Sequence, residues 1–259
     1  MKRSGLIAVL LALALLAAAS ATAEVEQEGN LVVSFDGGIS PHALPRVGTA
    51  PVAVKVETTI KTSDGSNPPP QLREISIGIN REGKLFNRGL PTCRIRSIQP
   101  ATIEAARRIC GGAIVGSGRV SVQVHLANQP PFTFNGPLLV FNAKPSGSKR
   151  RILAQVYGIR PPSAFVLSFK ILRRQGTFGT LIRTILPTSA RKWAYVTHFE
   201  MRLRRTYTHE GKRRSYVSAG CAAPAGFPGA IYAFARGTFE FAGGRQVTST
   251  LTRDCKVRS

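Results

Sequence analysis

The chain has 259 residues, with 36 lysine and arginine residues against 13 aspartate and glutamate residues, and a formal charge of +23. Hydrophobic residues make up 43% of it and charged residues 19%, a composition that excludes a wholly disordered chain. Glycine and proline are too few for a collagenous or low-complexity sequence, and the length suffices for one large domain or two small ones.

The N-terminus has the three parts of a secretory signal peptide. Lys2 and Arg3 precede an apolar run over residues 6–19, and the small residues Ala21 and Ala23 follow it. The pattern predicts a signal peptide over residues 1–23 with cleavage after Ala23. An uncleaved membrane anchor is the alternative, but the run is shorter than the roughly 20 residues that a helix needs to span a bilayer. The mature chain, residues 24–259, contains no second such run.

Short β-type runs separated by turn residues dominate the mature chain. In residues 51–61, for example, Val52, Val54, Val56 and Ile60 alternate with polar residues, which is typical of a half-buried strand. About a dozen such strands predict an all-β fold, an antiparallel sandwich or open barrel. The expected strands cover residues 31–35, 51–61, 75–79, 119–127, 138–142, 152–159, 164–172, 177–186, 193–206, 214–219, 231–241 and 246–252.

One short helix is expected between the first two cysteines, over residues 102–109. Thr102 can cap its N-terminus, Glu104 lies in its first turn, and glycines follow Cys110. Gly116-Ser117-Gly118 is interpreted as a turn. The polar segment 143–149 is a possible domain boundary, yet it also suits a hairpin loop, and we favour a single domain over residues 24–259 with a split near 143–149 as the alternative.

Four cysteines, an even number, lie in the mature chain. In an exported protein they predict disulfides, of which four cysteines allow three arrangements. Proximity in sequence favours Cys93–Cys110 and Cys221–Cys255. A zinc site is disfavoured because no CxxC motif is present.

Seven segments of the mature chain form a recognisable set, namely residues 35–41, 44–46, 89–93, 110–118, 176–180, 218–229 and 249–255, and those that contain cysteine are the most specific. Together they resemble a group of exported β-rich proteins of high-GC actinobacteria to which no activity, ligand or site is assigned. The resemblance implies an extracytoplasmic β-rich protein and transfers no functional residue.

Positive charge is concentrated in residues 149–214, where sixteen basic and two acidic residues give +14, whereas residues 24–80 carry −3. Such a field attracts polyanions, and the guanidinium fork of arginine suits phosphate and carboxylate groups. Codon bias of a high-GC genome is an alternative origin of the arginines. The predicted anion-binding residues are Arg173, Arg174, Arg202, Arg204, Arg205, Lys212, Arg213 and Arg214.

Motifs for catalysis are weak. GxSxG, a nucleotide-binding glycine loop and metal-ligand spacings of histidine are missing, so we expect no metal, cofactor or specific nucleic-acid motif. His198 and Glu200 are the best available acid–base pair. Alternation places them on one face of strand 193–206 with Ala194, Val196, Arg202 and Arg204, and places Trp193, Tyr195, Phe199, Met201 and Leu203 on the apolar face.

The sequence thus favours an exported non-enzymatic protein of the cell envelope or extracellular space. Its expected partners are an anionic wall polymer, an acidic polysaccharide or an anionic lipid surface, bound through the basic face. A secreted hydrolase acting on an envelope polymer, and a structural or protein-interaction module, are the alternatives. The sequence leaves the oligomeric state open.

Overall fold

A computed structural model describes residues 23–259 except for residues 66–67, 148, 160–161, 189 and 259. The predicted signal peptide therefore lies, apart from Ala23, outside the described residues. The loop over residues 143–149 is described except at residue 148.

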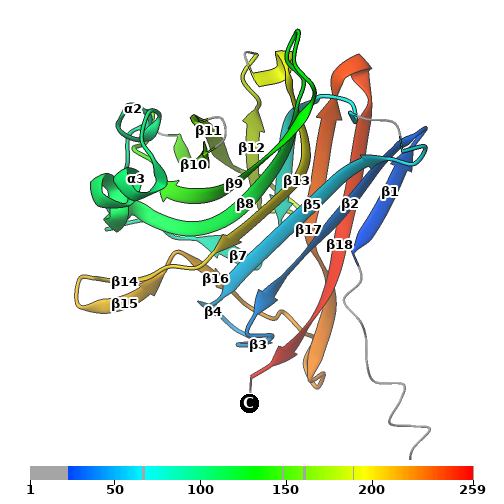
Figure 1. The fold of residues 1–259 in the computed structure, drawn as a ribbon. Coiled ribbons are helices and arrows are strands. Elements are labelled where there is room, and N and C mark those ends of the chain that lie inside the picture. The colour runs from blue at the N-terminus through cyan, green and yellow to red at the C-terminus, as the bar shows by residue number, and fades with distance from the viewer. Residues whose placement is uncertain (1–22, 66–67, 148, 160–161, 189, 259) are drawn as a thin grey trace, which may run out of the picture.

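The fold is all-β, as predicted, and its main feature is one curled sheet of 13 strands that forms a half-barrel (Figure 1). The strand order is β1-β2-β5-β13-β8-β9-β10-β11-β12-β6-β17-β18-β3. Neighbours pair antiparallel except β18 and β3, which are parallel. The bounds of these strands are β1 Glu24–Glu28, β2 Leu31–Ser40, β3 Ala43–Leu44, β5 Ala53–Thr62, β6 Leu72–Ile79, β8 Ile114–Val124, β9 Phe132–Asn142, β10 Arg150–Ile159, β11 Pro162–Arg173, β12 Thr180–Ile185, β13 Ala194–Leu203, β17 Gly229–Phe241 and β18 Gln246–Val257.

Two smaller sheets complete the strands. One contains β4 Ala50–Pro51, β16 Val217–Ala219 and β7 Gly83–Leu85, and the other is the hairpin of β14 Thr206–His209 and β15 Lys212–Ser215. Short 3-10 helices cover Gly111–Ala113, Ala190–Lys192 and Ala242–Gly244.

The two margins of the curled sheet meet through side chains. The Arg253 guanidinium of β18 donates a hydrogen bond to the Asp36 carboxylate of β2 at 2.6 Å, and the two groups form an ion pair. At the other end of β18, the backbone amide of Gln246 donates a hydrogen bond of 3.1 Å to the side-chain carboxylate of Glu28 on β1. These contacts join the two margins of the curled sheet, although β2 and β18 share no backbone ladder.

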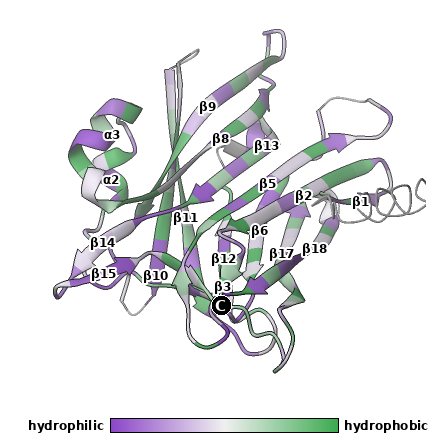
Figure 2. Cartoon of the chain, turned by 90° about the horizontal axis from the view of Figure 1, so that it is seen from below, coloured by the Kyte–Doolittle hydropathy of each residue, from purple (hydrophilic) through white to green (hydrophobic). Residues whose placement is uncertain are grey.

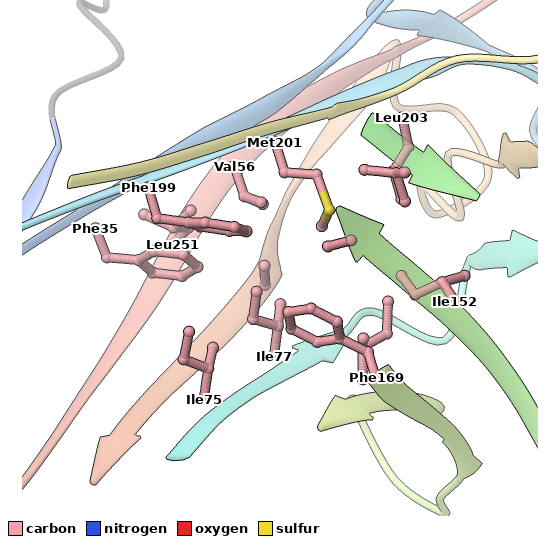
Figure 3. Packing of buried hydrophobic residues seen from close by; sticks show 14 of the residues in the cluster. Phe35, Val56, Ile75, Ile77, Ile152, Phe169, Phe199, Met201, Leu203 and Leu251 are labelled. Atoms are coloured by element: carbon pink, nitrogen blue, oxygen red, sulfur yellow. The ribbon is translucent and has the colours of Figure 1, made fainter. Parts of the chain in front are cut away.

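Alternation along the strands produces the core inside the curl. Residues of one parity, such as Val56 on β5, Ile75 and Ile77 on β6, and Ile152 on β10, are buried. Figure 3 shows how side chains from opposite walls point toward one another in this core. Burial of one such aliphatic side chain stabilises the fold by about 1.5–3 kcal/mol.

A helical cover lies on the outer face of β9 and β10. It consists of α2, Ile95–Ile98, which was not expected, and α3, Ile103–Cys110, which confirms the predicted helix. The Thr102 hydroxyl caps α3 by accepting a hydrogen bond from the Ala105 amide. Because the helices cover the second face of β9, Leu139 and Phe141 are buried there while Leu138 and Val140 face the main core.

The buried Gln155 fastens this cover to the sheet. Its side-chain amide donates hydrogen bonds of 2.7 Å to the carbonyls of Ile98 and Ala101. The disulfide Cys93–Cys110 closes the same segment, and Cys221–Cys255 joins the chain after β16 to β18. Both predicted pairings are therefore present, and disulfides persist in oxidising, extracytoplasmic surroundings.

The turn expected at Gly116-Ser117-Gly118 is wrong, because these residues lie within β8. A Cβ atom at Gly116 or Gly118 would collide with a backbone carbonyl of β13, that of Arg202 or Glu200. The glycines thus serve close strand packing instead of chain reversal.

The predicted faces of β13 are also partly wrong. A register shift between Val196 and His198 in the pairing with β8 marks a bulge, which leaves Thr197 outside the ladder. Tyr195 consequently packs on the outer face against His125, with ring centroids 5.1 Å apart, while Val196 lines an interior cavity. Beyond the bulge, Phe199, Met201 and Leu203 are buried as predicted.

Strand register defines two ends of the half-barrel. Leu203 at the end of β13 pairs near the start of β8 and of β5, and the β14–β15 hairpin follows directly; we call this the hairpin end. At the opposite end, Ala194 of β13 and Phe132 of β9 both pair with Val124 of β8. In both views the hairpin and the helical cover project on one side of the molecule, and β1 lies on the other (Figures 1 and 2).

Candidate functional site

The β14–β15 hairpin displays three of the predicted cationic residues. Its two central turn residues, Glu210 and Gly211, both have positive φ, of 52° and 70°, as in a type I′ turn. The register pairs Tyr207 with Arg214 and His209 with Lys212, so these four side chains share one face. Figure 2 shows the hydrophilic character of β15.

The hairpin is docked on the segment that follows β7. The Tyr207 hydroxyl donates a hydrogen bond of 2.9 Å to the Arg88 carbonyl, and the Arg214 guanidinium lies 5.4 Å from the centre of the Phe86 ring. His209 packs directly over Gly89. Burial raises the pKa of Tyr207, and the charge of Arg214 partly opposes this effect.

Docking leaves the other cations of this region facing solvent. Lys212, Arg213 and Arg204 are exposed, whereas Arg214 and Arg205 are half-buried. In the part of the chain that the structure describes, none of the eight predicted anion-binding side chains forms an ion pair or a side-chain hydrogen bond. The exposed guanidinium and ammonium groups are therefore available to an external anion, whereas the Nε atoms of Arg205 and Arg214 are buried.

The eight residues do not form one cluster. Arg204, Arg205 and Lys212–Arg214 surround the hairpin, and exposed Arg173 and Arg174 end β11 at the same end of the sheet. Arg202 lies apart, because its strand pairs it with Lys55, and Glu200 lies two residues away on the same face.

Arg150 belongs to this region although it was not among the eight predicted residues. Its guanidinium donates to the Leu85 carbonyl at 3.0 Å, and β10 pairs it with Ile171, two residues before Arg173. It therefore connects the hairpin's docking segment with the end of β11. A basic run at residues 149–151 is visible in sequence, but its position beside the hairpin depends on tertiary pairing.

A fully buried tyrosine, Tyr216, lies behind the hairpin. Burial strongly raises the pKa of its hydroxyl, while the nearby positive charge of Arg150 lowers it. The Tyr216 backbone amide donates to the Arg205 carbonyl at 2.8 Å, and its carbonyl accepts from the Phe86 amide at 2.9 Å. This residue fixes the hairpin and its docking segment to the same point of the core.

His198 and Glu200, the candidate acid–base pair, lie on the outer face of the sheet as predicted. The Nε2 atom of His198 is 3.7 Å from the carboxylate of Glu57, a diagonal neighbour that the register pairs with Glu200. Glu57 also forms an ion pair of 2.6 Å with Lys55, and this hydrogen bond raises the pKa of Lys55. The arrangement is a mixed-charge network along β5 and β13.

Among the described residues, no three or more His, Cys, Asp or Glu side chains are placed to hold a metal ion. None of the helices in the described ranges is both long and apolar enough to cross a membrane.

Comparison with known proteins yields no match to a family model, to a curated protein or to a solved structure.

Proposed function

We propose that this chain is an exported, non-enzymatic protein of the cell envelope or extracellular space that contacts anionic polymers through the hairpin end. The observation that carries the proposal is the set of exposed Lys and Arg side chains around a docked hairpin, without ion pairs among the described residues. A surface that is ordered before binding loses less conformational entropy when the ligand arrives.

Export is supported by two independent features. The first is the basic, apolar and small-residue pattern of residues 1–23. The second is the pair of disulfides, a type of bond that is rare in reducing compartments.

The expected ligands are phosphate-bearing or carboxylate-bearing polymers outside the cell. Arginine outnumbers lysine 26 to 10 in the chain, and its planar fork can bind either anion with two parallel hydrogen bonds. Arg150 lies between the hairpin's docking segment and the end of β11, so an extended polymer that follows this end of the sheet can contact several cations at once.

Binding of the mature chain, residues 24–259 with both disulfides intact, should be measured against a teichoic acid, an acidic polysaccharide and neutral dextran over a range of salt concentrations. We expect binding to the anionic polymers alone, weakening as salt rises because counterions are released. Lys212→Gln with Arg213→Gln should reduce the slope of log affinity against log salt by roughly 0.7–0.9 for each lost phosphate contact.

Arg191→Gln with Lys192→Gln is the matched control, because it removes the same charge at the opposite end of β13. Equal losses in both double variants would show a non-specific charge effect and contradict a site at the hairpin. Equal affinity for dextran would contradict anion recognition altogether.

A further inference from the structure

The end of the half-barrel opposite the hairpin contains a cavity of about 360 Å³. Its walls come from β8, β9, β10, β11 and β13 and from the segment that joins β12 to β13. It is separate from the proposed anion-binding surface, because the two features lie at opposite ends of β13.

The cavity lies at a fork in the sheet. The ladder between β12 and β11 covers only Lys170–Arg173 of β11. Beyond that ladder, the Thr184 hydroxyl donates a hydrogen bond of 3.1 Å to the Ser168 carbonyl. Phe165 of β11 and Leu186 after β12 both line the cavity, so it occupies the space where the two strands separate. The bulge at Thr197 contributes by turning Val196 into the same space.

The walls of the cavity are aliphatic and aromatic. Phe134, Phe165 and Trp193 form a continuous series of ring contacts, with centroids 6.4 Å and 5.6 Å apart. Phe165 and Trp193 are only half-buried although they lie on the cavity wall. Gln99 and Ser163 are the polar side chains that the described lining contains.

Size and chemistry together define the class of ligand. Small-molecule pockets span roughly 300–1,000 Å³, so this cavity lies near the lower limit and suits one hydrocarbon chain better than two. The cavity has room for several water molecules, each of about 30 Å³, but its walls offer them few hydrogen-bond partners. Transfer of an apolar chain into the cavity is therefore favourable in proportion to the apolar surface that it buries.

Two cations lie in the chain segment that borders the cavity, and we call this segment the rim. Arg191 and Lys192 belong to a 3-10 helix between Pro187 and Trp193, and both of these flanking residues line the cavity. The Arg191 guanidinium donates a hydrogen bond of 3.0 Å to the Thr188 hydroxyl, and its Nε atom is buried. An anionic head group at the rim would therefore meet the charges of the exposed Lys192 and of the half-buried Arg191 at their outer nitrogen atoms.

We propose that the cavity binds a single long-chain fatty acid, with the hydrocarbon chain between Phe165, Trp193 and the valines of β8, and with the carboxylate at Arg191 and Lys192. The ligand is an amphiphile whose two parts match the apolar interior and the cationic rim.

The chain provides its own reporter, because Trp193 is its one tryptophan. A brominated hexadecanoate quenches tryptophan fluorescence only on close contact, so it should quench Trp193 saturably at micromolar concentrations. Arg191→Gln with Lys192→Gln should raise the Kd of the acid about tenfold, which corresponds to 1.4 kcal/mol. The same variant should leave the binding of the brominated C16 alcohol unchanged, and Lys212→Gln with Arg213→Gln is the matched control that should alter neither.

Filling the cavity tests the chain-binding part. Val122→Phe with Val196→Phe should abolish quenching by both brominated probes, and circular dichroism should confirm that this variant is folded. If it does not fold, Ala164→Leu changes a single lining residue and should weaken the binding of both probes several-fold. Non-saturable quenching of the native chain, or quenching that survives in folded filled variants, would overturn the proposal. Equal affinity for brominated octanoate and hexadecanoate would also overturn it.

Discussion

Gly89 shows how one residue determines whether the hairpin can dock. Its φ is +79°, a conformation that costs other residues about 1–2 kcal/mol, and a Cβ atom there would collide with the His209 ring. The docked position of the hairpin thus depends on a residue more than 100 positions away in the sequence.

Gly89→Ala should therefore lower the free energy of unfolding by about 1–3 kcal/mol through backbone strain and the displacement of His209. It should also increase hydrogen exchange in residues 206–215, measured by mass spectrometry. Gly38→Ala is the control, because a Cβ atom there meets no heavy atom within 4 Å and the φ of Gly38 is not in the left-handed region. Unchanged exchange in the Gly89 variant would contradict the docking role.

At the scale of elements, the helical cover over β9 and β10 depends on few contacts. Helix α2 has four residues and α3 has eight, lengths at which isolated helices are unstable in water. Their order derives from a small apolar cluster, the amide of Gln155 and the disulfide Cys93–Cys110. The main core lies on the other side of the sheet, so the cover can loosen without unfolding the half-barrel.

Replacing Cys93 and Cys110 by alanine should reduce stability by about 3 kcal/mol, because the disulfide closes a loop of 17 residues. Limited proteolysis should then cut residues 94–112 first. The Cys221→Ala/Cys255→Ala variant is the comparison, since its loop of 34 residues predicts a slightly larger loss and no cleavage in the cover. Identical cleavage patterns in the two variants would contradict a specific role of the Cys93–Cys110 disulfide in the helical cover.

At the scale of the molecule, the cationic surface around the hairpin, the acidic strand β1 and the apolar cavity lie in different places. Acidic side chains occur along β1, at Glu24, Glu26 and Glu28, on the side away from the hairpin and the arginines of α3. The apolar cavity lies at the end opposite the hairpin. A polymer on the cationic surface and a fatty acid in the cavity would consequently not compete for the same atoms.

We expect the mature chain to unfold in one cooperative transition, which is the single-domain prediction. The alternative boundary at residues 143–149 connects β9 to β10, two strands paired from Leu138 to Asn142. Strands from both sides of this boundary thus share one sheet and one core. Calorimetry should give equal calorimetric and van't Hoff enthalpies, whereas two separate transitions would favour two domains.

The sequence by itself determined the fold class and the helix capped by Thr102, because alternation and capping are local signals. Proximity of the cysteines in sequence favoured both disulfide pairings among three possible arrangements, and the structure decided between them. The separation of charge along the chain likewise indicated a basic region. Tertiary structure alone decided which side chains meet in this basic region. The docking of the hairpin on Phe86 and Gly89, and the position of Arg150 beside the hairpin, depend on long-range strand pairing.

The same limit explains the errors and the missed cavity. Gly116 and Gly118 are indistinguishable from turn residues in sequence, and only the approach of the β13 backbone makes glycine necessary there. A bulge at Thr197 reverses the faces of Tyr195 and Val196, since one extra residue changes a period of two. The cavity arises where β11 and β12 separate. This separation depends on how the whole sheet curls, so no local sequence pattern predicts it.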